Sequence, residues 1–154
     1  MASGRARCQT RPVATSWNDT PRASVRRYGA RVGEDVLVER LIALLDGAEL
    51  TDELAFALAG PASRPVLAGG AGGPSGYWAR VWALRGLLYV FDDVATSHVV
   101  AACADPAWRV REMALKVVAT HALDDALEAV AARQLDDVAR VRAASTRALQ
   151  RLVS

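Results

Sequence analysis

The chain has 154 residues, of which 52% are hydrophobic, 23% charged and only 6% aromatic, and its formal net charge is +2. This length suits one soluble domain and argues against a second full domain. Because alanine, leucine and valine dominate the apolar set, the composition favours helices and argues against a β-sandwich or a β-barrel.

Several classes of site are excluded by their residue types. The two cysteines, Cys8 and Cys103, support neither a disulfide framework nor a cysteine-based zinc site. His98 and His121 are the only histidines and have no second ligand at metal-binding spacing, so His121 is expected to be a core residue. No apolar stretch is long enough to span a membrane, and no apolar secretory signal begins the chain. We therefore expect a cytoplasmic protein without metal, cofactor or membrane span.

The net charge conceals a division of the chain. Residues 1–33 contain seven arginines and a single acid, Asp19, so they carry +6, while residues 34–154 carry −4. The first segment shows no helical or alternating period and contains prolines and glycines, so we expect a disordered basic arm. An arginine-rich, acid-poor start is also typical of organellar transit peptides, but eighteen arginines against one lysine favour a bacterial, GC-rich coding bias.

Two helices are predicted after this arm. The first begins near Glu34 and ends at Gly47, and the second begins at Thr51 and ends at Gly60. Their apolar residues recur at helical spacing: Val36, Leu37, Leu41, Leu44 and Leu45 in the first, and Leu54, Phe56 and Leu58 in the second.

A glycine-rich segment follows at residues 62–76. We expect it to be a mobile connection with a short helical turn at residues 65–68. It lacks the Gly-Lys-Ser/Thr ending of a phosphate-binding loop. Whether residues 34–75 form a true repeat of the kind described next or a terminal cap stays open at this stage.

The second half of the chain repeats itself with a period of 31 residues. A shift of 31 aligns eight identical residues, and a second shift carries Arg109-Val110-Arg111 onto Arg140-Val141-Arg142. The eight identities are Arg80 with Arg111, Ala83 with Ala114, Leu84 with Leu115, Asp93 with Asp124, Ala95 with Ala126, Val99 with Val130, Ala101 with Ala132 and Asp105 with Asp136. Two successive shifts of equal length predict equivalent units at about residues 76–106, 107–137 and 138–154.

Each unit resolves into a longer and a shorter helix. The longer helices are predicted at residues 77–90, 106–120 and 138–153, and the shorter ones at residues 94–104 and 125–135. Because neither kind of helix buries its apolar stripe alone, the pairs are expected to stack into a continuous core.

Acidic residues mark the predicted helix starts. Asp105 is expected to cap a long helix that has Pro106 at its first position. The caps of the other helices are expected from Asp93, Asp124 and Asp136 or Asp137. Capping thereby explains the paired carboxylates without acid–base catalysis; the pairs are Asp92-Asp93, Asp124-Asp125 and Asp136-Asp137.

The segments Asp105–Ala114 and Asp136–Arg142 resemble HEAT repeats, in particular the short HEAT-like repeats of phycobilin lyases, in which an Asp precedes a Val-Arg pair. The resemblance implies an all-α fold for residues 34–154: an armadillo-type α-solenoid, a superhelical stack of antiparallel helix pairs. It also implies a side-chain ladder between successive turns, which corresponds here to Asp105 with Arg111 and Asp136 with Arg142. The first unit departs from the pattern, with Pro74 in place of the Asp and Ala79 in place of the Val.

Stacked units place residues that are 31 apart in one row. Since the resemblance puts the longer helices on the concave side, we expect a basic partner-binding face there and a more acidic outer face on the shorter helices. The plain alternative is that arginine fills the exposed side of amphipathic helices, and Glu112 interrupts the patch. Trp82 is expected in the core. The residues of the predicted face are Arg85, Lys116 and Arg147 in one row, Trp78, Arg109 and Arg140 in a second row, and Trp108 beside it.

The resemblance specifies an architecture and not an activity, since the family includes scaffolds, transport receptors, DNA-repair glycosylases and lyases. We expect a non-catalytic scaffold or adaptor that binds another macromolecule, first of all a protein, through the exposed face of the longer helices. The alternative is a nucleic-acid-binding protein related to repeat-type DNA alkylbase glycosylases, which would use the basic arm and the arginine rows with Trp78 or Trp108. A lyase-type chaperone that delivers a cofactor is a third hypothesis, which rests on the repeat resemblance alone.

Overall fold

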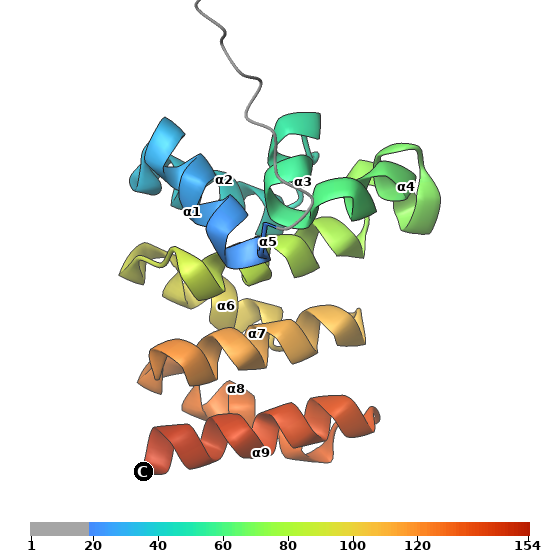
Figure 1. The fold of residues 1–154 in the computed structure, drawn as a ribbon. Helices are drawn as coiled ribbons and strands as arrows, with labels where there is room; N and C mark the ends of the chain where they lie inside the picture. The colour runs from blue at the N-terminus through green and yellow to red at the C-terminus, as the bar shows by residue number, and fades with distance from the viewer. Residues whose placement is uncertain (1–18) are drawn as a thin grey trace, which may run out of the picture.

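The computed structural model describes residues 19–154, apart from the side chain of Ser75, and this part of the chain is all-helical, with no strand (Figure 1). Short 3₁₀ turns connect several of the helices, at Gly60–Ser63, Gly70–Ser75, Asp93–Ala95, Asp124–Ala126 and Arg133–Leu135. The α-helices are α1 (Pro21–Val32), α2 (Glu34–Leu45), α3 (Asp52–Ala59), α4 (Arg64–Leu67), α5 (Tyr77–Tyr89), α6 (Thr96–Ala102), α7 (Trp108–His121), α8 (Leu127–Ala132) and α9 (Ala139–Val153).

Helix α1 corrects the prediction of a disordered arm. The helix begins after Thr20, whose Oγ1 accepts a hydrogen bond from the backbone N–H of Ala23 at 3.2 Å. Pro21 occupies the first helical turn, where its missing N–H is harmless, and Gly33 ends the helix at a φ of 100°. Val25 and Tyr28 are buried. The prediction is therefore wrong for Pro21–Val32, and the rest of the predicted arm, residues 1–18, lies outside the described residues.

Helices α2 and α3 agree with the sequence-based boundaries. Helix α2 ends in a turn at Asp46 and Gly47, and Gly47 has a φ of 100°, a conformation that favours glycine. Helix α3 is capped by Thr51, whose Oγ1 accepts from the N–H of Leu54 at 3.3 Å. The helix boundaries expected from the residue types are thus observed to within one or two residues.

The glycine-rich segment is folded against the helices. Helix α4 coincides with the turn predicted at residues 65–68, and 3₁₀ turns flank it on both sides. Ser63 and Val66 are buried, and Pro74 accepts a backbone hydrogen bond from Leu50 at 3.1 Å. The segment thereby packs against the chain between α2 and α3 instead of looping outward from the helices.

The second half of the chain forms successive layers. The long helices α5, α7 and α9 lie side by side, each in contact with the next, and the short helices α6 and α8 connect them (Figure 1). On its other side α5 packs against α2 and α3. The buried positions of the long helices are mostly small or aliphatic, which lets the layers approach closely; they include Ala83, Leu84, Leu87, Val110, Ala114, Val117, Val141, Ala144 and Ala148.

Helix α5 begins where it was predicted, whereas α7 and α9 begin two residues and one residue later than predicted. Asp105 does not cap a helix that begins at Pro106; its carboxylate accepts from the N–H of Ala107 at 2.9 Å, and α7 begins at Trp108. Asp136 makes the equivalent bond to the N–H of Val138 at 3.0 Å. In this turn the aspartate side chain accepts from the backbone N–H two residues further along the chain, and each helix begins only after that residue.

The capping aspartates of the short helices also require correction. Asp92, not Asp93, accepts the hydrogen bond from the N–H of Val94, at 3.0 Å. Asp124 makes no side-chain capping bond, since the turn there begins at Leu123 without one. A carboxylate at a helix start is therefore not a sufficient mark of a cap, because the side chain must also point back at the free N–H groups.

Candidate partner-binding face

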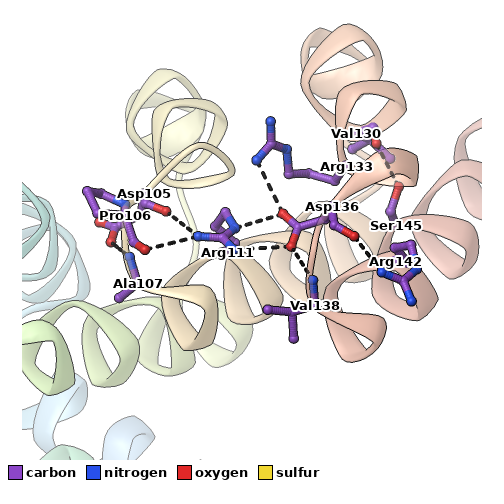
Figure 2. A network of polar contacts seen from close by, with 10 residues as sticks. All are labelled: Asp105, Pro106, Ala107, Arg111, Val130, Arg133, Asp136, Val138, Arg142 and Ser145. Carbon is purple, nitrogen blue, oxygen red and sulfur yellow. Dashed lines mark hydrogen bonds and ion pairs between the residues drawn. The ribbon is translucent and has the colours of Figure 1, made fainter.

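Arginine–aspartate pairs link successive layers of the stack. Arg80 donates from Nε and Nη2 to the carboxylate of Asp105 at 2.7 and 3.1 Å, and Arg111 donates in the same way to Asp136 at 2.8 and 3.1 Å. Figure 2 shows the second pair, with Arg111 between the turns of two successive units. The bidentate geometry matches the planar guanidinium to the carboxylate, so each pair fixes the rotation of one layer against the next.

Arg111 and its equivalent Arg142 also bind the backbone at the end of the preceding unit. Nη1 of Arg111 donates to the carbonyls of Asp105 and Pro106 at 2.9 and 3.1 Å, and Arg142 donates to the carbonyl of Asp136 at 2.6 Å (Figure 2). The four residues of the predicted ladder therefore lie in one network, but the pairing differs from the expectation. The carboxylates of Asp105 and Asp136 are bound by Arg80 and Arg111 of the same unit. Arg111 and Arg142 instead reach the backbone carbonyls at the end of the preceding unit.

Arg80 is the member of this network that the sequence analysis missed as a ladder residue. The Pro74 and Ala79 departures led us to treat the first unit as atypical, although Arg80 aligns with Arg111 in the 31-residue repeat. The identity of Arg80 and Arg111 in this alignment is the sequence feature that predicts Arg80 as a ladder residue.

The electrostatics of Asp136 suit a structural role. Burial by itself raises the pKa of this carboxyl, but the hydrogen bonds from Arg111 and from the N–H of Val138, with the charges of Arg111 and Arg133, outweigh burial and hold the pKa below its usual range. The carboxylate therefore stays ionised at neutral pH and remains available to bind the arginines.

Tryptophan and arginine side chains alternate across the three long helices. The guanidinium of Arg109 on α7 lies 4.4 Å from the ring centre of Trp108 and 5.7 Å from that of Trp78 on α5. The guanidinium of Arg140 on α9 lies 5.5 Å from the ring centre of Trp108. These distances are within the range of cation–π attraction. We call Trp78, Arg109, Trp108 and Arg140 the Trp–Arg column; it joins both predicted tryptophans to two of the predicted arginines.

The column is anchored in the core at one end. Trp78 stacks on Trp82 with ring centres 5.8 Å apart and an interplanar angle of 30°. Trp82 is 4% exposed, which agrees with the prediction that it is a core residue. Because Trp82 cannot move without opening the core, the stack restricts the orientation of Trp78 and, through it, of the column.

Glu112, the acid that interrupts the basic patch, has two cations around it. Its carboxylate accepts from Nε of Arg140 at 3.2 Å and lies 3.6 Å from Nζ of Lys116. Glu112 is only 8% exposed, whereas Arg140 is exposed. A shielded carboxylate beneath two cations holds them in place and leaves the face positively charged.

Besides Lys116, two further residues of the predicted face are not part of the column. Arg147 is exposed on α9 and has no ion pair within residues 19–154. Arg85 is half-buried on α5 and lines a hollow of about 250 Å³ together with Phe56 and Arg64, toward α1 and α3. Of this predicted row, Lys116 is linked to the column, through its ion pair with Glu112.

His121 and the buried Cys103 have structural surroundings. Nε2 of His121 lies 2.7 Å from the carbonyl oxygen of Leu87, and its ring stacks on Phe91 at 4.3 Å. Burial raises the pKa of the Cys103 thiol to about 12 and so disfavours the reactive thiolate, a cause that the nearby charge of Arg133 only partly opposes. Within the part of the chain that the structure describes, no three His, Cys, Asp or Glu residues are placed to hold a metal ion.

Comparison with known proteins gives no relative: no family model, curated protein or solved structure matches the chain. Among the described residues, no helix combines the length and the apolar character that a bilayer crossing requires. What the face binds is therefore inferred from its geometry and charge.

Proposed function

We propose that the chain is a small HEAT-like α-solenoid that serves as a non-catalytic scaffold and binds an acidic segment of another protein. Three features support the solenoid assignment. The sequence repeats every 31 residues, long and short helices alternate in layers, and arginine–aspartate pairs recur between the layers. Stacked units of this kind present an extended surface on which a partner segment is bound.

The observation that carries the proposed function is the Trp–Arg column. Tryptophan and arginine are the residue types that dominate binding energy at protein interfaces. In the column each guanidinium lies over an indole ring, which restricts its motion before a partner arrives and lowers the entropy lost on binding. The guanidinium N–H groups of Arg109 have no hydrogen-bond acceptor within residues 19–154, so they are available to a carboxylate of the partner.

Nucleic acid is the second candidate partner, favoured by the composition of α9. This helix contains Arg140, Arg142, Arg147 and Arg151 and no acid. Bases would stack on the tryptophans while the arginines contact phosphates. Glu112 opposes any anionic partner, but a phosphate chain that follows the column passes close to its carboxylate, whereas a protein segment can place its carboxylates at Arg109 and away from Glu112.

The test is a pair of titrations on the full chain, one with a glutamate-rich peptide and one with duplex DNA, each at low and high salt. We expect the peptide to bind and the double variant Arg109→Ala, Arg140→Ala to weaken it at least about tenfold, because two charge-assisted contacts are lost. Arg151→Ala removes an exposed arginine of α9 outside the column and is the matched control.

The charges of residues 1–18 are tested separately. Because α1 contributes Val25 and Tyr28 to the core, a chain that starts at Glu34 would lose part of the fold, so Arg5, Arg7 and Arg11 are replaced by glutamine in the full chain instead. Duplex binding that disappears with these substitutions is nonspecific attraction of charge. Duplex binding that survives them, exceeds peptide binding and depends on Arg109 and Arg140 would replace the protein-scaffold proposal with the nucleic-acid one.

A further inference from the structure

A groove follows the seam between α1 and α3 and reaches the first repeated layer at α5. It consists of two adjoining hollows of about 250 and 160 Å³, which share Ser24, Phe56 and Ala57. The larger hollow extends to α4 and α5, where Arg64 and Arg85 line it. The groove thus brings together side chains from four helices that the function proposed above does not use.

The arginines around the groove are of two kinds. Arg27 and Arg31 form ion pairs with acidic neighbours; the partner of Arg27 is Asp19, whose carboxylate also lines the larger hollow. Arg64 and Arg85 make no hydrogen bond or ion pair with any residue that the structure describes, although Arg85 is half-buried. A guanidinium that has lost part of its hydration without gaining an acceptor favours an anion beside it.

The rest of the lining is apolar or already hydrogen-bonded. Phe56 lines both hollows, and Pro21 and Pro61 line the larger one. Ser24 donates its hydroxyl to the carbonyl of Ala57 at 2.7 Å, so this donor is not available to a ligand. The other charged side chains of the lining, Asp19, Arg27, Arg31 and Glu53, are already in ion pairs. A molecule in the groove therefore meets apolar surface and paired charges, and the cations of the groove without an ion pair among the described residues are Arg64 and Arg85.

We propose that this groove binds a small amphiphilic carboxylate, in which an acyl chain or an aromatic ring ends in one carboxylate. The carboxylate lies at Arg64 and Arg85, and the apolar part lies against Phe56. The larger hollow is near the lower limit of ligand pockets, which typically begin at about 300 Å³, so the ligand is small. The proposal is independent of the scaffold function, because it shares no residue with the Trp–Arg column.

Octanoate, titrated into the full chain by isothermal titration calorimetry, is the probe. Two compounds serve as controls. Octyltrimethylammonium has the same alkyl chain with a positive charge, and inorganic phosphate has a negative charge without an alkyl chain. We expect saturable binding of octanoate to one site and at least about tenfold weaker binding of the other two, because each of them satisfies only half of the groove.

Variants assign the site. The double substitution Arg64→Gln, Arg85→Gln is expected to weaken octanoate at least about tenfold, since the charged contacts are lost, and Phe56→Ala to weaken it by a smaller factor through the lost apolar contact. Arg151→Gln, an exposed arginine on α9, is the matched control and leaves octanoate binding unchanged. Circular dichroism verifies that each variant remains helical.

Three results would overturn the proposal: no saturable binding of octanoate at millimolar concentration, equal binding of octyltrimethylammonium or phosphate, or full affinity in the double arginine variant. If the double variant does not fold, amide chemical shifts of the unsubstituted chain decide. Changes on adding octanoate that are confined to α1, α3, α4 and the neighbourhood of Arg85 support the site, and changes confined to other helices refute it.

Discussion

Arg111 connects two layers through a single side chain. Its guanidinium donates to both carboxylate oxygens of Asp136 and to the backbone carbonyls of Asp105 and Pro106. The side chains of Arg111 and Asp136 are only 13% and 2% exposed. In such a pair the attraction is partly offset by lost hydration, but removal of one partner leaves a shielded charge without compensation. The effect of the pair on stability is therefore largest when one of its two residues is replaced.

We predict that Asp136→Asn lowers the free energy of unfolding by about 3 kcal/mol, because Arg111 and Arg133 then lose their shielded counter-charge. Urea denaturation followed by circular dichroism measures this difference. Asp137→Asn is the matched control, since the neighbouring aspartate is exposed and is not part of the network. Equal stability of the two variants would contradict the role assigned to Asp136.

The same comparison has a defined dependence on pH. The folded-state pKa of Asp136 lies below the unfolded value of about 3.9, so the unfolded state binds the proton first as pH falls. The stability supplied by the ionised carboxylate is complete above that unfolded pKa and is lost as pH falls through the lower folded pKa. The difference between the unsubstituted chain and Asp136→Asn is thus constant near neutral pH and shrinks below about pH 4.

At the scale of residues, the sequence predicted which side chains belong to the column and the ladder better than it predicted which of them contact one another. The 31-residue alignment placed Trp78 and Arg109 in one row, and they are in contact in the column. The ladder was predicted as Asp105 with Arg111 and Asp136 with Arg142, whereas Arg80 and Arg111 bind these carboxylates. The spacing along the chain does not tell which carboxylate a stacked helix presents to an arginine. The double pairing of Glu112 was missed because a sequence shows an acid but not its burial.

At the scale of elements, the sequence predicted helices best where their apolar stripes were repeated. The ends of α5, α7 and α9 lie within two residues of the predicted ones. Helix α1 was missed because four arginines surround a narrow stripe at Val25 and Tyr28, so the composition outweighed the period. Its start at Thr20-Pro21 and its end at Gly33 were nevertheless typical helix boundaries.

Tyr28 provides the test of α1 as a docked helix. The residue is 5% exposed, its ring lies 5.2 Å from the guanidinium of Arg31, and its hydroxyl oxygen accepts from Arg40 on α2. We predict that Tyr28→Ala lowers the free energy of unfolding by about 3 kcal/mol, the cost of truncating a buried aromatic side chain. Urea denaturation provides the measurement.

The matched control for Tyr28 is Arg26→Ala on the exposed side of the same helix. A surface change of this kind is expected to alter stability by no more than about 0.5 kcal/mol. If Tyr28→Ala is as mild as Arg26→Ala, residues 21–32 do not dock and the disordered arm that the sequence suggested is restored.

At the scale of the whole molecule, the charge is divided differently once α1 is counted with the other helices. The whole chain carries +2 and residues 1–18 carry +3, from Arg5, Arg7 and Arg11, so residues 19–154 carry −1. Within this nearly neutral part the charges are sorted by element. Helix α9 has arginines and no acid. The turns and short helices around α6 and α8 carry exposed acids instead, at Asp92, Asp93, Asp124, Asp125 and Glu128. The described residues therefore keep basic and acidic segments apart, and four of the seven arginines of residues 1–33 lie within α1.

The order of the layers implies an order of local stability. Helix α7 contacts a long helix on each side, α5 and α9, whereas α9 contacts α7 and the short α8. In a stack whose units touch only their neighbours, the element with fewer neighbours opens first. We predict that native-state hydrogen exchange, followed by mass spectrometry, is slowest in α7 and faster in α9.

A substitution in α9 makes this prediction specific. Val141 is fully buried in α9, and Val141→Ala removes two methyl groups, a loss of about 1.6 kcal/mol that corresponds to about tenfold faster exchange. Because α5 does not depend on α9 for its contacts with α2 and α3, the increase is expected in α9 and not in α5. Ala143→Ser, at an exposed position of the same helix, is the control. An equal increase in α5 and α9 would mean that the layers open together as one cooperative core, which would contradict a stack of separately stabilised units.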